Sequence, residues 1–290
     1  MNRVIKVSDE TINKMIEYYK DKLREKTPPY AIFQAEEEDT VVTLYESGKA
    51  MFQGTSADVD ANMWQDMDNH LRGQSLDKEN DYYYVNAIGS DEVGTGDYFG
   101  PIVVSAAYVN KKDIKFLEEL GIRDSKKITD DIILEIVPKL IKRIKYASVI
   151  LNNKEYNDKY SNEVNMNKIK AILHNKVLSN VLTNKLEYDY IIVDKFVSED
   201  NYYKYLKESI KPVKKITFLT KAEDKNLSVA CASVISRYIF IKEFDKLSDQ
   251  LKIKLPKGAG KIVDEIGKEI VTKYGSQKLK EISKYNFKNT

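Results

Sequence analysis

The 290-residue sequence predicts an α/β protein in which a large domain with a mixed β-sheet follows a small α+β domain. Three observations support this prediction. Beyond residue 83, short apolar runs come first and then alternate with helical patterns, which is typical of a layered α/β fold. Residues 1–72 show instead a helix, three short strands and a second helix. A polar, turn-rich segment at residues 73–82 separates the two patterns.

The N-terminal pattern begins with apolar residues at helical spacing between Ile12 and Tyr19. They predict an amphipathic helix over residues 1–24, capped by Ser8 or Thr11. Three strands and a helix are predicted next, at residues 31–36, 40–45, 49–53 and 57–71.

The larger domain contains apolar runs of strand length between helical patterns. Strands are predicted at residues 83–90, 101–109, 146–151, 188–194 and 216–220, and helices at 113–120, 130–144, 165–184, 199–210 and from 227 onward. We therefore expect a domain at residues 1–75, a linker at 76–84 and a second domain at 85–290.

The amino-acid composition limits which metals, locations and partners the chain can have. One cysteine and two histidines exclude a zinc site built from Cys and His, so any metal is held by carboxylates, which favours Mg²⁺ or Mn²⁺. No apolar run reaches the roughly 20 residues of a membrane span, and we expect a cytoplasmic protein. Residues 1–80 hold 10 basic and 16 acidic residues of the chain's 47 and 45, so the basic excess lies in the larger domain. That excess weakly favours a phosphate-bearing partner.

Acidic residues follow three of the predicted strands. Asp91 and Glu92 follow the first, Asp194 ends "IIVD", and Glu223 lies just past "ITFLT", with Asp224 beside it as a rival. Ligands gather at strand ends in open α/β sheets, and four converging carboxylates need cations. Two Mg²⁺ ions would satisfy them and could catalyse phosphoryl displacement. The alternative for each acid alone is a solvated strand end or a helix cap.

Two turns complete the set of candidate site features. Gly94-Thr95-Gly96 directly follows the acidic pair, and its amides could face a phosphate or a ribose hydroxyl. It matches neither a phosphate-loop nor a dinucleotide fingerprint. Asp124-Ser125-Lys126-Lys127 could hold a phosphate backbone or could be an ordinary solvated loop. His174 is expected to be packed or at the surface.

Five motifs of the sequence together resemble those of a known enzyme family. "GSDEVGTGDYFGPIVVSA", "DSKKI", "IIVDKF", "KAEDKNLSVACASVISRY" and "LPKGAG" occur here in the order and spacing of the type 2 ribonucleases H. The match covers about residues 83–265 and most resembles bacterial ribonuclease HIII, because Gly94-Thr95-Gly96 stands where ribonuclease HII has Gly-Arg-Gly. The N-terminal pattern resembles the module of ribonuclease HIII that is similar to half of a TATA-box-binding protein.

The resemblance implies an RNase H-like mixed-sheet catalytic domain that cleaves the RNA strand of RNA/DNA hybrids, leaving 3′-hydroxyl and 5′-phosphate ends. It assigns metal binding and catalysis to Asp91, Glu92, Asp194 and Glu223, with Asp91 bridging two ions of Mg²⁺ or Mn²⁺. Substrate binding falls on Gly94, Thr95, Gly96, Ser125 and Lys126. We expect a monomer. Alternatives are cleavage at single ribonucleotides in DNA, as in ribonuclease HII, and a non-catalytic nucleic-acid-binding module.

The N-terminal domain departs from what nucleic-acid binding needs. It is acidic overall, although affinity for nucleic acids depends on phosphate neutralisation. We therefore expect it to hold a hybrid through a local basic face or through its sheet surface. The basic residues considered are Lys20, Lys22, Arg24 and Lys26.

Overall fold

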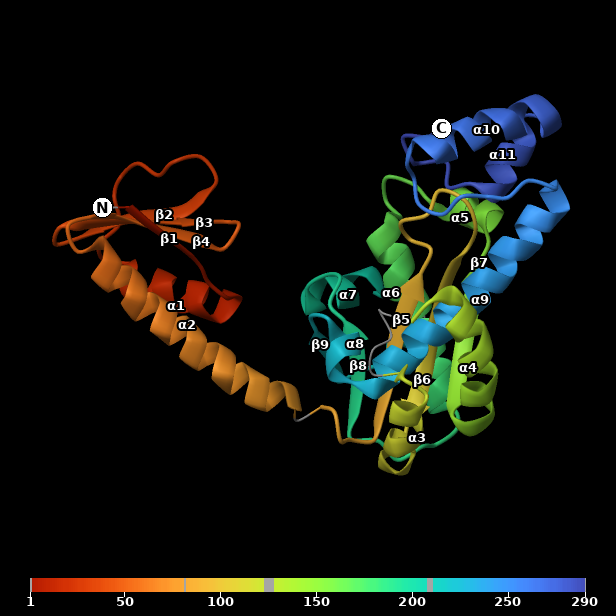
Figure 1. The fold of residues 1–290 in the computed structure, drawn as a ribbon, viewed down its shortest axis with the longest axis horizontal. Coiled ribbons are helices and arrows are strands. Elements are labelled where there is room, and N and C mark those ends of the chain that lie inside the picture. Colours follow the sequence, from red (N-terminus) through yellow and green to blue (C-terminus); the bar gives the residue numbers. More distant parts are fainter. Residues whose placement is uncertain (1, 81, 123–127, 208–210, 290) are drawn as a thin grey trace. The chain divides into compact units, whose positions relative to one another are not determined.

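The computed structural model describes residues 2–80, 82–122, 128–207 and 211–289, without the side chains of 70 and 72–80. It divides into two compact units, Met1–Asp81 and Tyr82–Thr290 (Figure 1). Each unit has its own hydrophobic core. The boundary between them falls inside the segment predicted as a linker. The secondary structure of this segment differs from the predicted linker, because α2 (Ala57–Asn80) continues as a helix through most of residues 76–84.

In its described residues, the N-terminal unit is an antiparallel four-stranded sheet with helices on one face (Figure 1). Its strand order is β1-β4-β3-β2, and α1 and α2 supply the buried Tyr19 and Trp64. The Trp64 indole N–H donates to the Tyr19 hydroxyl at 3.0 Å. The elements are β1 (Asn2–Lys6), α1 (Asp9–Tyr19), β2 (Ala31–Glu37), β3 (Thr40–Tyr45), β4 (Lys49–Gly54) and α2.

The predicted first helix is wrong over residues 2–6, which form β1 and pair with β4 from Asn2 to Lys6. A strand this short has little periodicity of its own, and pairing with β4 decides its conformation. The helix begins after Ser8, whose side chain accepts from the Thr11 amide, so the predicted Ser8 cap is confirmed. The three predicted strands are confirmed within one residue at each end. The likeness to half of a TATA-box-binding protein stays a prediction.

The larger unit is built on a mixed five-stranded sheet in its described part, in the order β7-β6-β5-β8-β9. β6 pairs antiparallel with both β5 and β7, whereas β5, β8 and β9 are parallel. This confirms the predicted α/β class with a mixed sheet. The strands are β5 (Ala87–Val93), β6 (Ile102–Val109), β7 (Lys145–Leu151), β8 (Tyr190–Asp194) and β9 (Ile216–Leu219).

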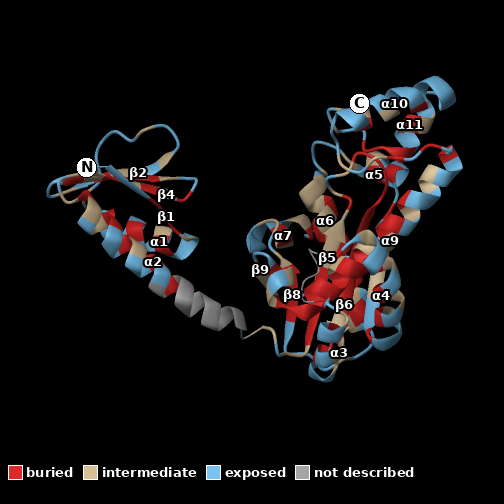
Figure 2. Cartoon of the chain, viewed as in Figure 1, coloured by how far each residue is buried: buried red, intermediate tan, exposed pale blue. Residues whose placement is uncertain are grey.

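Helices cover both faces of this sheet (Figures 1 and 2). Alternate residues of β6 show the division: Val104 packs in the core that contains α6, and Ala107 in the core that contains α4 and α9. The helices are α3 (Ile114–Glu119), α4 (Asp130–Arg143), α5 (Asn153–Lys159), α6 (Met166–Leu182), α7 (Glu199–Tyr205), α8 (Ala222–Lys225), α9 (Leu227–Leu251), α10 (Lys261–Tyr274) and α11 (Ser276–Ile282); the 3₁₀ turn η1 (Lys111–Asp113) precedes α3. Among the helices of the described residues, none combines the length and apolar character that a membrane span requires.

Gly89 lets α9 lie directly on β5. A Cβ atom at this position would come within 2.4 Å of the Val229 amide nitrogen and 2.5 Å of the Ser228 hydroxyl. Only glycine permits this approach of helix backbone to strand. The contact fixes the start of α9, and therefore also the short helix α8 just before it, against the strand that carries Asp91 and Glu92.

Candidate active site

The four predicted acids lie on neighbouring elements at one end of the parallel strands. Asp91 and Glu92 are inside β5, not after it as predicted, because Asp91 still pairs with Ser105 of β6. Asp194 is the last residue of β8, which runs parallel beside β5. Glu223 lies in α8, directly after β9. The carboxyl ends of parallel strands meet at the same edge, so the topology gathers these side chains.

Electrostatics supports this grouping. Burial raises the pKa of Asp91 to about 7, and the charges of Glu92 and Glu223 add to the shift, although a hydrogen bond from Ser233 opposes it. Burial also raises the pKa of Asp194, again with Glu223 and Glu92 adding to it, while the Ala222 amide donates to Asp194 Oδ1 at 2.9 Å and opposes it. The negative charges of Glu92 and Glu223 therefore raise the pKa of both Asp91 and Asp194.

Glu92 is held by two residues of α6. Lys170 Nζ forms an ion pair with Glu92 Oε1, and His174 Nε2 lies 2.9 Å from Glu92 Oε2. The other ring nitrogen of His174 lies 2.8 Å from the Ser90 hydroxyl. Burial alone would raise the pKa of Glu92, but the His174 hydrogen bond and the charge of Lys170 lower it overall. Glu92 is therefore the acid in this group whose charge is already balanced by protein side chains.

Sequence reasoning did not find these two supporting residues as part of the site. His174 is fully buried, as one of the two alternatives predicted, but it contacts a site carboxylate. Lys170, with its Nζ 4.1 Å from the centre of the Phe196 ring, was not considered. Their spacing of four residues on α6 puts both on one helix face, which is the signal that could have found them.

The Gly94-Thr95-Gly96 turn follows β5 and presents its last residue to solvent. Gly94 has φ +89°, and a Cβ there would lie 2.2 Å from the Pro101 carbonyl oxygen, so the turn is anchored at its start. Gly96 is exposed, and no atom of the described residues lies near the place of a Cβ, so a ligand can approach its backbone. The predicted substrate-binding residues Ser125 and Lys126 lie outside the described residues.

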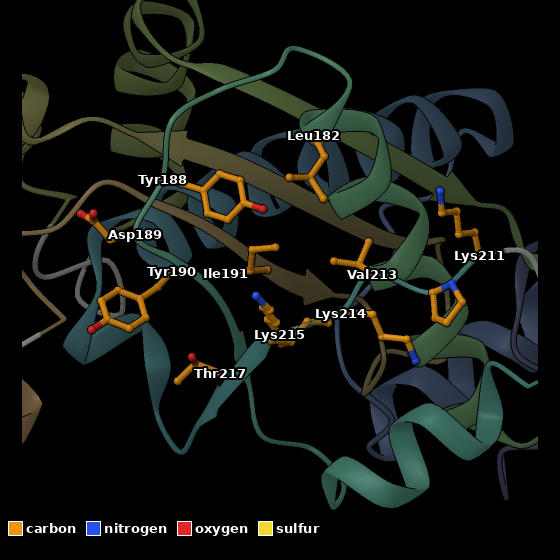
Figure 3. A pocket seen from close by; sticks show the side chains of 12 residues that line it. Leu182, Tyr188, Asp189, Tyr190, Ile191, Lys211, Val213, Lys214, Lys215 and Thr217 are labelled. Atoms are coloured by element: carbon orange, nitrogen blue, oxygen red, sulfur yellow. The ribbon is translucent and has the colours of Figure 1, made fainter.

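A pocket at the opposite end of the same strands is separate from these acids. It lies where β8 and β9 begin, and Figure 3 shows Tyr188, Tyr190 and Lys215 around it. Ligands of open α/β sheets bind at the carboxyl ends of the strands, and the acids lie at that end. The carboxylate end is therefore the better candidate for the chemistry.

The comparisons with known proteins agree with this geometry. Residues 88–290 match the family model described as Ribonuclease HII, and residues 2–75 match a domain of unknown function, DUF3378. The chain is 40% identical to Ribonuclease HIII of Bacillus mycoides, over 99% of this chain and 96% of that one. The chain belongs to the ribonuclease HIII family. Ribonuclease HIII of Bacillus cereus is 39% identical over the same shares of the two chains.

Solved structures give the same family. A crystal structure of Bst-RNase HIII in complex with Mn²⁺ has a TM-score of 0.71 and 35% identity, covering 100% of this chain and 97% of that one. Aquifex aeolicus RNase H3, at 24% identity and a TM-score of 0.57, covers 98% of this chain and 99% of that one and supports the fold alone. As a member of the ribonuclease HIII family, the chain has the RNase H-like fold and is a divalent-metal-dependent endoribonuclease of the ribonuclease H type.

The acids of this ribonuclease HIII relative fit a divalent cation by their chemistry. Carboxylate oxygens are the ligands that Mg²⁺ and Mn²⁺ prefer. The pKa of Asp91 and of Asp194 is raised first by burial and then by the negative charges of Glu92 and Glu223, and a cation would offset both effects. Among the described residues, no three His, Cys, Asp or Glu side chains are grouped closely enough to hold a metal ion as they stand. Glu92 is instead engaged by Lys170 and His174.

Glu223, and not Asp224, is predicted to be the fourth metal ligand. Its charge raises the pKa of both Asp91 and Asp194, whereas Asp224 contributes to neither among the largest causes. Glu223→Gln should lower kcat by roughly 100-fold or more, because even an outer-shell partner of a metal contributes about 10–100-fold. Asp224→Asn is the matched control and should keep near wild-type activity. Steady-state cleavage of a labelled hybrid measures both, and the reverse order would move the ligand to Asp224.

Proposed function

We propose that the chain hydrolyses the RNA strand of RNA/DNA hybrids with two Mg²⁺ or Mn²⁺ ions, leaving 3′-hydroxyl and 5′-phosphate ends. The observation that supports the proposal is that the elements carrying Asp91, Glu92, Asp194 and Glu223 lie at or just past the carboxyl ends of the parallel strands β5, β8 and β9. Four carboxylates from distant parts of the sequence bring repulsion to a partly buried site, and divalent cations offset it.

Each acid has a role in this proposal. Asp91, Glu92, Asp194 and Glu223 would hold the two ions through their carboxylate oxygens. When bound, the ions would supply an activated water and stabilise the leaving oxygen. Lys170 and His174 orient the Glu92 carboxylate through its two oxygens. The buried Ser90 hydroxyl beside His174 holds the imidazole ring in place.

Recognition of RNA is assigned to the turn after β5. The exposed backbone of Gly96 and the hydroxyl of Thr95 would contact ribose 2′-hydroxyls, the group that distinguishes RNA from DNA. Ser125 and Lys126 would hold the backbone of one strand. The larger domain also carries the chain's basic excess, which suits a polyanionic partner.

A gel assay on three labelled duplexes tests the proposal. The substrates are a full RNA/DNA hybrid, a DNA duplex with four ribonucleotides and a DNA duplex with one, each with Mg²⁺, Mn²⁺ or EDTA. We expect metal-dependent cleavage of the first two and none of the third. Cleavage at the single ribonucleotide would support an activity like that of ribonuclease HII. Hybrid binding without any cleavage would leave a nucleic-acid-binding module.

The N-terminal unit is proposed to hold the hybrid through its sheet surface. Its candidate basic face is largely neutralised, because Lys20 pairs with Glu17 at 2.6 Å, Arg24 with Glu36 at 2.7 Å, and Lys22 with Glu37. The sheet face opposite the helices instead offers a row of side chains across four paired strands, formed by Val4, Met51, Thr43 and Gln34. Val4 is exposed, Met51 and Gln34 are half-buried, and Thr43 is buried.

Deleting residues 1–81 should raise the Michaelis constant for the hybrid by about tenfold or more while kcat at saturation changes little, because these residues bind but do not react. Steady-state kinetics of the full and shortened chains measures this. An unchanged Michaelis constant would contradict the role.

The proposal also places the chain in the cytoplasm as a monomer. Size-exclusion chromatography with light scattering checks that it is a monomer.

A further inference from the structure

Lys284 is a buried lysine that the proposed chemistry does not use. Its side chain has no exposed surface. Nζ donates to the carbonyl oxygens of Asp97 and Gly100, both at 2.7 Å, and the Lys284 backbone N–H donates to the Tyr98 carbonyl at 2.8 Å. All three acceptors belong to the loop between β5 and β6, which begins with Gly94.

The buried Lys284 amine has two carbonyl acceptors, and its burial favours the form of the amine that two acceptors can satisfy. Burial lowers the pKa of Lys284 to about 7, with the Asp97 carboxylate opposing the shift. An ammonium brings three N–H donors and a neutral amine brings two, so both donors of the neutral form are satisfied by the two carbonyls. The anchor therefore persists whether or not the amine carries its proton.

The same loop is tied to the C-terminal segment at further points. The Gly100 N–H donates to the Ile282 carbonyl at 3.2 Å, and the Tyr98 N–H donates to the Gly258 carbonyl at 2.9 Å. The Gly258 N–H in turn donates to Asp97 Oδ1 at 2.6 Å. Residues 97–100 are thus held by elements that follow α9, far along the chain from β5.

The hydrogen bonds that hold residues 97–100 fix the C-terminal end of the Gly94-Thr95-Gly96 turn. Gly94 is fixed by the end of β5 and by its close approach to the Pro101 carbonyl. Asp97 is fixed through its carbonyl by Lys284. Thr95 and Gly96 span the interval between these two fixed points, and within the described part of the chain no atom lies within 4 Å of the Cβ position at Gly96. Their placement depends on the two ends.

We propose that Lys284 is a positioning residue for the Gly94-Thr95-Gly96 turn, so that the C-terminal segment governs how well the site distinguishes RNA from DNA. The inference rests on the proposed function, in which this turn contacts ribose 2′-hydroxyls. Lys284 touches neither substrate nor metal in this account. Its effect passes through the backbone of residues 97–100.

The test compares Lys284→Met, which keeps the length of the side chain and removes its donors, with Lys288→Met, a nearby exposed lysine. Three quantities are measured for each: the KM for an RNA/DNA hybrid, the inhibition constant of a DNA duplex of the same sequence, and kcat. Amide hydrogen exchange at residues 94–97 is followed in parallel. We expect Lys284→Met to raise the KM about tenfold, as the loss of one or two hydrogen bonds to 2′-hydroxyls would, with the DNA inhibition constant unchanged.

Faster exchange at residues 94–97 in Lys284→Met, with wild-type behaviour of Lys288→Met, completes the expected result. If Lys284→Met does not fold, Lys284→Gln carries the test, because its amide retains two N–H donors on a shorter chain. A variant with lower thermal stability but an unchanged ratio of the two constants would overturn the inference. If the wild-type chain itself does not prefer the hybrid, the proposed function fails instead, so the two failures are distinguishable.

Discussion

Replacing Asp91 with asparagine is expected to abolish cleavage of an RNA/DNA hybrid, with kcat falling by at least about 1,000-fold. Asp91 is central to the candidate site, since the charges of Glu92 and Glu223 both act on it. Asparagine keeps the shape of the side chain but loses the charge that would bridge two cations. Hybrid binding should persist, because the groups proposed to contact the substrate are elsewhere. Single-turnover cleavage with Mg²⁺ and Mn²⁺ measures this, and full activity would mean that the site is misplaced.

The same variant is expected to be more stable than the wild type in EDTA at neutral pH. The pKa of Asp91 is raised from 3.8 to about 7 in the folded chain, so the folded state binds a proton that the unfolded state releases. Stability is therefore lost as pH rises from about 4 to about 7. Asparagine carries no such charge, and Asp91→Asn should gain on the order of 1–3 kcal/mol over the wild type at pH 8.

Urea unfolding of both proteins in EDTA at pH 5 and pH 8 measures this difference. Comparing the two proteins at each pH cancels groups that they share, such as Lys284, whose lowered pKa makes stability rise above neutral pH. Glu92 acts in the other direction, because its lowered pKa contributes stability that is lost only as the pH falls from 4.5 to about 2. An advantage of the variant that is the same at both pH values would contradict the assignment.

Gly89→Ala is expected to lower the free energy of unfolding by about 3 kcal/mol, because the new methyl group overlaps helix backbone that cannot rotate away. The clash is with the Val229 amide nitrogen at 2.4 Å and the Ser228 carbonyl carbon at 2.6 Å. Cleavage should also fall in the protein that remains folded. α9 must move off β5, and Glu223 in α8 directly before it would move with it.

Gly96→Ala is the matched control for this prediction. A Cβ at Gly96 meets no atom of the residues that the structure describes within 4 Å, and Gly96 does not have the left-handed backbone that disfavours alanine. Its free energy of unfolding should equal that of the wild type within about 0.5 kcal/mol. Equal stability of Gly89→Ala and Gly96→Ala in urea would show that α9 does not depend on the close approach at Gly89.

The fold was predictable where apolar periodicity is long, as in α4 and α9, or where turns are marked, as at Gly48 between β3 and β4. β1 was not predictable, because its five residues take their conformation from pairing with β4. Asp91 and Glu92 were expected beyond the strand end. Pairing with β6 extends β5 through both, and the identity of the partner strand is a tertiary fact.

The residues of the candidate site also divide into those that the sequence pattern indicates and those that only tertiary contacts reveal. The acids could be named from the sequence because each lies at or near the end of an apolar run. Lys284 could not, and Lys170 and His174 gave only their four-residue spacing on α6 as a signal, because the roles of all three arise from contacts 78 to 187 residues away along the chain. A lysine in a polar sequence gives no sign of burial until the loop that it supports is in place.

Direct measurement of Mn²⁺ binding tests the central claim most closely. Isothermal titration of the wild type, Asp91→Asn and Asp224→Asn with Mn²⁺, with and without an uncleavable hybrid analogue, separates metal binding from catalysis. The account predicts two ions for the wild type with the analogue, the same for Asp224→Asn, and weakened binding by at least about tenfold for Asp91→Asn. Equal Mn²⁺ affinity in the wild type and Asp91→Asn would contradict the account, because the carboxylates at the ends of β5 and β8 would not be the metal site.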